Sequence, residues 1–135
     1  MERLNERLAL ARKALATLAE VLVEHPSAIQ RDAAIQRFEY SFEAVWKAAQ
    51  LYLRIHEGTE VASPKGVIRA ADSVKSLSPE QTSLALAMAD GRNLTVHTYN
   101  EGLADLIYSR LRGYHSLMTA WLGAMQSALP PASRD

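Results

Sequence analysis

An arginine, an asparagine and a histidine lie close together in the chain and are the residues best suited to chemistry. They are Arg92, Asn93 and His97, within the polar segment Arg92–Asn100. If the segment is helical, Asn93 and His97 are four residues apart and share a face, whereas Arg92 lies about 140° round the helix axis from His97. A long arginine side chain can still bend toward a site that the histidine faces.

This combination of side chains suits the cleavage of RNA phosphodiesters. A neutral imidazole can take the proton of a 2′-hydroxyl, and that oxygen can then attack the adjacent phosphorus. A guanidinium neutralises the charge that develops on the phosphoryl oxygens. One His97 supplies a base but no acid, so a two-fold dimer that brings a second His97 and Arg92 to the same cleft fits better. A surface or structural role for both side chains remains the simpler alternative.

A second charged segment precedes this one. Glu39, Glu43 and Lys47 recur every four residues and share one helix face. Such a stripe is commonly a solvated face in which each pair of opposite charges contributes about 0.2–0.5 kcal/mol. Glu39 and Glu43 repel each other, however, and gain more if Arg37 or an arginine of another helix meets them. Both a structural role and a partner surface remain open.

The chain has no cysteine, and His25, His56 and His115 have no metal-ligand spacing with each other or with His97. It has no glycine-rich phosphate loop either. We therefore expect neither a metal ion nor another cofactor.

Apolar residues spaced three and four apart predict helices that position these segments. The predicted helices are one over Leu4–Leu22, a longer one from about Ser27 to His56, a short one from Ser63-Pro64, one from Ser78-Pro79, and a last one opened by Thr98–Glu101. Gly58 is a natural stop for the second helix. Gln81 is placed to close a capping box on Ser78, and Glu101 on Thr98. Gly91 is a weak point, because glycine costs about 1 kcal/mol inside a helix, and we expect it to loosen the turn that carries Arg92.

No segment alternates with a period of two over the length of a strand. The predicted fold is therefore all-α, an up-and-down antiparallel helical bundle of four main helices and a short one. We expect residues 1–129 to form a single domain and residues 130–135 to be a frayed tail.

The charge balance argues against one class of function. Fifteen Lys and Arg residues match fifteen Asp and Glu residues. A protein that coats nucleic acid without specificity needs a basic excess, although a local basic pocket is still possible. The charged first residues do not resemble a signal peptide, and the longest apolar run, Leu84–Ala89, is far shorter than the ~20 residues of a membrane span. We expect a cytoplasmic protein with no membrane partner.

Three segments together resemble one known family. They are Ile35–Lys47, Ser63–Arg69 and Asp90–Glu101, the last of which contains the arginine, four residues and histidine of the HEPN motif. Their order and content resemble the HEPN-domain nucleotidyltransferase substrate-binding proteins over nearly the whole chain. Members of that family are helical homodimers encoded beside a minimal nucleotidyltransferase, with which they form toxin–antitoxin pairs.

The resemblance implies roles for individual residues. Arg92 and His97 match the catalytic pair of a metal-independent ribonuclease toxin, and Asn93 matches a supporting polar residue. Tyr99 matches the tyrosine that the nucleotidyltransferase antitoxin modifies with AMP. Such a modification would block cleavage, because it places negative phosphates where the RNA phosphate must bind.

Two functions therefore remain open. The first is the RNA-cleaving toxin. The second is a non-catalytic subunit that presents a nucleotide or an acceptor group to the nucleotidyltransferase, with Arg37, Glu39, Glu43, Lys47 and Tyr99 as the docking or acceptor surface. A purely structural helical dimer is a third interpretation that only the resemblance opposes.

Overall fold

The computed structural model describes residues 2–130, which form five α-helices, one 3-10 helix and no strand. The elements are α1 (Glu2–Leu22), α2 (Ala28–Glu57), α3 (Pro64–Ser73), α4 (Pro79–Leu94), η1 (Thr95–His97) and α5 (Glu101–Ala128). The predicted all-α bundle of four long helices and a short one is confirmed. Of the predicted tail, residues 131–135 lie outside the described range. Among residues 2–130, no helix is long and apolar enough to cross a membrane.

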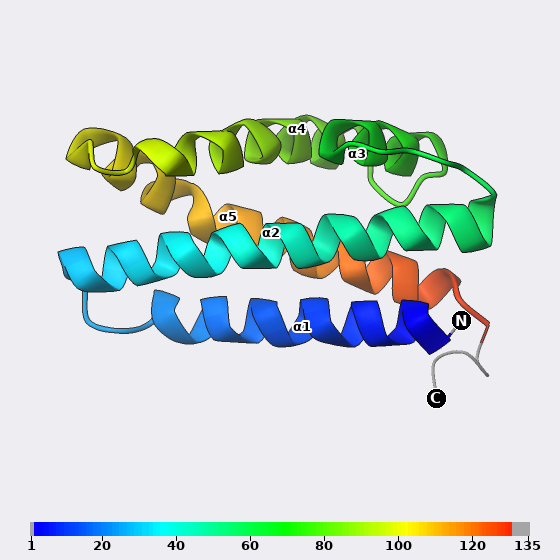
Figure 1. The fold of residues 1–135 in the computed structure, drawn as a ribbon, viewed down its shortest axis with the longest axis horizontal. Coiled ribbons are helices and arrows are strands. Elements are labelled where there is room, and N and C mark those ends of the chain that lie inside the picture. Colours follow the sequence, from blue (N-terminus) through cyan, green and yellow to red (C-terminus); the bar gives the residue numbers. More distant parts are fainter. Residues whose placement is uncertain (1, 131–135) are drawn as a thin grey trace.

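The helices form three layers, with α2 and α5 in the middle (Figure 1). Helix α1 packs against α2 and α5 from one side, and α3 and α4 pack against them from the other. The four long helices alternate in direction, so the ends of α1 and α4 and the starts of α2 and α5 meet at one end of the bundle. The start of α1 and the end of α2 lie together at the opposite end.

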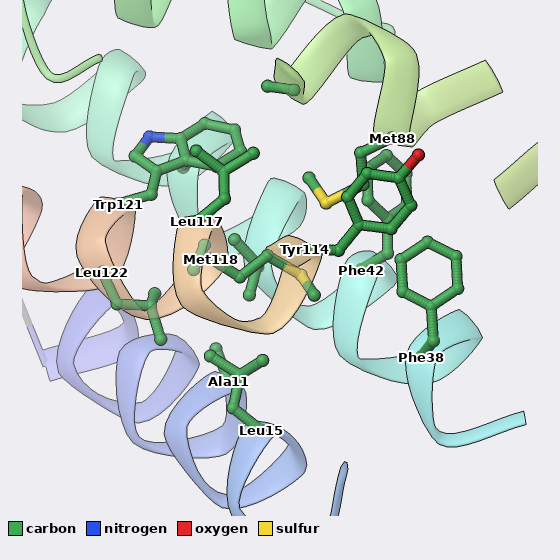
Figure 2. Close-up of a cluster of buried hydrophobic side chains, with 14 of the residues drawn as sticks. Ala11, Leu15, Phe38, Phe42, Met88, Tyr114, Leu117, Met118, Trp121 and Leu122 are labelled. Carbon is green, nitrogen blue, oxygen red and sulfur yellow. The ribbon is translucent and has the colours of Figure 1, made fainter. Parts of the chain in front are cut away.

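The core joins all three layers through α5 (Figure 2). Tyr114 stacks on Phe38 of α2 with ring centroids 5.5 Å apart, and Met88 reaches the same group from α4. On the other side of α5, Met118 and Leu122 point toward α1. Because α5 and α2 each bury side chains on two sides, loss of either helix would expose both halves of the core.

Most of the predicted helix boundaries are confirmed. Ser27, Ser63 and Ser78 are N-caps whose hydroxyls accept the expected backbone N–H groups, and Gln81 closes the capping box on Ser78. Gly58 ends α2 in the left-handed conformation, with φ of 66°. The start of the last helix differs from the prediction: its N-cap is Asn100, which accepts from the backbone N–H of Leu103 at 3.0 Å.

The expectation about Gly91 was wrong. Helix α4 continues through Gly91 to Leu94 without a break. Gly91 is buried where α4 crosses α5, and a Cβ at this position would lie 3.5 Å from the hydroxyl oxygen of Tyr114, an ordinary van der Waals distance. Packing against Tyr114 therefore holds the turn before Arg92 despite the intrinsic cost of glycine.

We predict that Gly91→Ala raises the free energy of unfolding by about 0.5–1 kcal/mol, because alanine fits the space and restricts the unfolded chain. Urea unfolding followed by circular dichroism measures this. Gly91→Leu is the matched control and should destabilise, because its larger side chain has to displace Tyr114. A destabilised Gly91→Ala variant would contradict the packing described here.

Candidate functional site

Arg92 lies in the last turn of α4 and points toward α2. Its Nη1 is 3.7 Å from Glu39 Oε2, and its Nε is 3.8 Å from Glu43 Oε1. These separations are those of ion pairs and exceed normal hydrogen-bond lengths. The arginine of another helix that the paired glutamates were expected to need is therefore Arg92. Its positive charge also suits the carbonyl end of α4.

A buried threonine holds the guanidinium end of the Arg92 side chain. Thr95 is buried, and its hydroxyl donates to the carbonyl oxygen of Arg92 at 2.7 Å while it accepts from Arg92 Nη1 at 3.1 Å. The Nε of Arg92 is buried and has no hydrogen-bond partner. This nitrogen is therefore enclosed by the protein, with the carboxylate of Glu43 3.8 Å away as its ion-pair partner.

Glu43 contacts more polar groups than the other charged residues of this stripe on α2. Besides Arg92, it accepts from Trp46 Nε1 at 3.2 Å and lies 3.9 Å from Lys47 Nζ. Arg37 does not join this group, because its Nη1 donates to the carbonyl oxygen of Thr17 on α1 at 2.7 Å. The structure thus brings Glu39, Glu43 and Lys47 to one side of α2 with Arg92 and directs Arg37 elsewhere.

His97 and Tyr99 lie together on the turn between α4 and α5. His97 Nδ1 is 3.3 Å from the Tyr99 hydroxyl oxygen, and the two rings meet edge to face with centroids 5.9 Å apart. Both side chains are exposed, Tyr99 to 82%. The phenol is therefore held by one neighbour while its other sides face solvent.

Hydrogen bonds and ion pairs shape this turn from both ends. Asn100 caps α5, and its backbone N–H donates to the carbonyl oxygen of His97 at 3.1 Å. Arg31 of α2 then ties down the start of α5 through Asp105 at 2.9 Å and Glu101 at 3.7 Å. Hydrogen bonds to Asp105 and then Asp32 raise the pKa of Arg31, so the charge that anchors the turn is retained at any ordinary pH.

Within one chain, Arg92 and His97 face different surroundings. Arg92 and Asn93 line a groove of about 370 Å³ between α2, α4 and the start of α3, beside Phe42 and Glu43. His97 does not line this groove, and no hydrogen bond or ion pair within residues 2–130 joins it to Arg92. The structure therefore brings Asn93, but not His97, to the groove that Arg92 lines.

The end of the bundle that carries Tyr99 also exposes apolar side chains, which sequence reasoning missed. Val23 and Ile29 are each 84% exposed where α1 passes into α2, and Val96 is 66% exposed beside His97. Their elements meet at this end of the bundle (Figure 1). The sequence carried no signal for this exposure, because it depends on how the ends of the helices pack together.

A family model and solved structures match this chain. A model of the family described as nucleotidyltransferase substrate binding protein like matches residues 6–127. A crystal structure of a protein from Thermus thermophilus is 60% identical over 85% of this chain and 98% of that one, with a TM-score of 0.83.

A more distant structure has the same fold. It is a Haemophilus influenzae protein described as having the fold of a substrate binding domain of a nucleotidyltransferase. It is 22% identical over 88% of this chain and 98% of that one, with a TM-score of 0.75. The search of curated proteins found no match.

We predict that Glu43 and Arg92 are energetically coupled by about 0.5–1 kcal/mol, the range of partly exposed ion pairs. A double-mutant cycle with Glu43→Gln and Arg92→Gln, read by urea unfolding, measures the coupling. Glu57→Gln provides the control, since Glu57 lies more than three helical turns from Glu43 on α2. A coupling no larger than that of the control pair would show that Arg92 does not depend on this carboxylate.

Proposed function

Because this chain belongs to the family of nucleotidyltransferase substrate-binding-like proteins, we propose that it is the partner subunit of a nucleotidyltransferase and presents Tyr99 to it as the acceptor group. The observation that carries this proposal is the exposed Tyr99 hydroxyl, whose oxygen is 3.3 Å from His97 Nδ1. Exposure gives the partner access to the phenol, and the imidazole is placed to receive the phenolic proton.

The proposed reaction uses ATP held by the nucleotidyltransferase. The Tyr99 oxygen forms a bond to the α-phosphorus of ATP while the bond from that phosphorus to the bridging oxygen of the β-phosphate breaks. Pyrophosphate leaves, AMP remains on the tyrosine, and the phenolic proton passes to His97 Nδ1. In this reaction His97 contacts the reacting oxygen, and the turn between α4 and α5 supplies both groups.

The exposed apolar residues at this end of the bundle support docking there. Val23, Ile29 and Val96 expose apolar area that a partner would cover, and exposed apolar patches on soluble proteins commonly mark partner surfaces. Arg31 holds the start of α5 firmly enough to offer a preformed surface, which lowers the ordering cost of association.

The position of Arg92 at the edge of a groove favours a second function, metal-independent cleavage of RNA by a homodimer. Arg92 and Asn93 line the groove between α2 and α4, and the ion pairs from Arg92 to Glu39 and Glu43 are long, so the guanidinium is placed to bind a phosphate that enters the groove. In a two-fold dimer, His97 of one protomer would act beside Arg92 of its partner, with exposed Asn93 as an added donor. AMP on Tyr99 would then inhibit cleavage, which joins the two functions in a toxin and its antitoxin.

The acceptor role is tested with the purified chain, its nucleotidyltransferase, ATP and Mg²⁺. Intact-mass spectrometry should show the addition of AMP to the wild type and none to Tyr99→Phe. The matched control is Tyr40→Phe, which removes another exposed tyrosine hydroxyl and should be modified normally. His97→Ala should slow modification by about 10²–10⁴-fold if the imidazole receives the proton. Modification of Tyr99→Phe at the wild-type rate would refute the assignment.

The ribonuclease role is tested with unmodified chain and single-stranded RNA in a chelating buffer. Arg92→Ala and His97→Ala should each reduce the cleavage rate at least about 10²-fold, since one loses charge stabilisation and the other the base. The control His56→Ala removes an exposed histidine near the end of α2, at the opposite end of the bundle, and should cleave normally. Cleavage that persists in His97→Ala, or no cleavage by the unmodified wild type, would refute the ribonuclease role. The acceptor role would then be the one that remains.

A further inference from the structure

A small basic pocket lies at the end of the bundle opposite Tyr99. It encloses about 150 Å³ between the start of α1, the last turns of α2 and the loop that follows α2. Its lining is Arg3 and Arg7 of α1, Lys47, Gln50, Leu51 and Arg54 of α2, and Thr59, Glu60 and Val61 of the loop. Four cationic side chains thus share one cavity with a single carboxylate, in a chain whose acidic and basic residues are equal in number.

These cations are poorly neutralised by the rest of the chain. Within residues 2–130, Lys47 is the member of the four that forms a salt bridge, and its partner Glu43 is 3.9 Å away and also contacts Arg92. Arg3 and Arg7 are four residues apart on α1, a spacing at which like charges repel. Repulsion between these side chains opposes folding. A bound anion would turn that repulsion into attraction.

The walls of the pocket are fixed before any ligand arrives. Gln50 Nε2 donates to the carbonyl oxygen of Val61 at 2.8 Å and ties the loop to α2. The backbone N–H groups of Gly58 and Thr59 both donate to the carbonyl oxygen of Leu53, so the chain turns sharply at the end of the helix. The loop wall is therefore held against α2, from which Lys47 and Arg54 project, and Arg3 and Arg7 project from α1, which packs along α2.

We propose that this pocket binds the phosphate groups of a small polyphosphate ligand such as a nucleoside triphosphate. Guanidinium groups bind phosphate oxygens through paired hydrogen bonds, and three arginines with a lysine can surround a group that bears several charges. The enclosed volume is below the ~300 Å³ of sites that take up a whole drug-sized ligand. The pocket therefore holds the phosphates and leaves a nucleoside at its rim.

The surroundings favour a small ligand over a nucleic-acid strand. A strand presents one phosphate after another and requires a continuous basic groove. Here the cations are confined to one pocket, Glu60 lies in its wall, and Glu2, Glu6 and Glu57 are close by in sequence. Arg54 is also 23 residues beyond Arg31 on α2, about 35 Å along the helix axis. A ligand bound here is therefore distinct from the nucleotide that would modify Tyr99 of the same chain, and the inference does not depend on that modification.

Equilibrium titration of the purified chain tests the inference, with ATP, inorganic tripolyphosphate, adenosine and a single-stranded oligouridine as probes. ATP and tripolyphosphate should bind with similar affinity, adenosine should not bind, and added salt should weaken both complexes. Arg7→Gln and Arg54→Gln should each weaken binding by about 10-fold or more. Arg110→Gln, which removes an exposed arginine of α5 outside the pocket, should bind like the wild type, and so should Tyr99→Phe.

Three results would overturn the assignment. They are no binding of ATP or tripolyphosphate at millimolar concentration, equal binding by wild type and the Arg7→Gln/Arg54→Gln double variant, and tighter binding of oligouridine than of ATP. A thermal melt of each variant without ligand separates loss of the site from loss of the fold. Arg54 is exposed, so its replacement should leave the melting temperature nearly unchanged.

Discussion

Helix α2 has to bury apolar side chains on two sides, and the rest of the molecule is arranged around that requirement. One side packs against α1 and α5, and the other packs against α3 and α4. Phe38 and Phe42 are fully enclosed as a result. The buried sides of α2 leave only narrow strips of its surface for charged residues. Each strip contacts a neighbouring helix.

Those strips account for the positions of the functional groups. Glu39 and Glu43 meet Arg92 where α4 ends, and this contact lies one turn before the segment that carries His97 and Tyr99. Farther along α2, Lys47 and Arg54 meet the start of α1 and form a basic pocket. The bundle thus keeps the turn with His97 and Tyr99 at one end and the basic pocket at the other, and α2 spans the distance between them.

Features that depend on nearby residues were predictable, and features that depend on the meeting of distant segments were not. The caps at Ser27, Ser63 and Ser78 are local hydrogen-bond patterns, and the sequence predicted them correctly. The choice of Asn100 over Thr98 as N-cap was missed, because both residue types cap well and η1 takes up the turn before them. For the glutamates of α2, the sequence left two candidate partners open, Arg37 and an arginine of another helix, and it could not choose Arg92. The exposed Val23 and Ile29 and the clustering of Arg3 and Arg7 with Arg54 follow from tertiary packing alone.

We propose that the end of the bundle with His97 and Tyr99 is the surface offered to the nucleotidyltransferase. Hydrogen–deuterium exchange of the chain with and without that enzyme tests it most directly, because backbone amides at the contact become protected. We expect protection of residues 94–102, together with the junction of α1 and α2 around residues 23–29. Protection confined to the start of α1 and the loop after α2, with residues 94–102 unchanged, would contradict it.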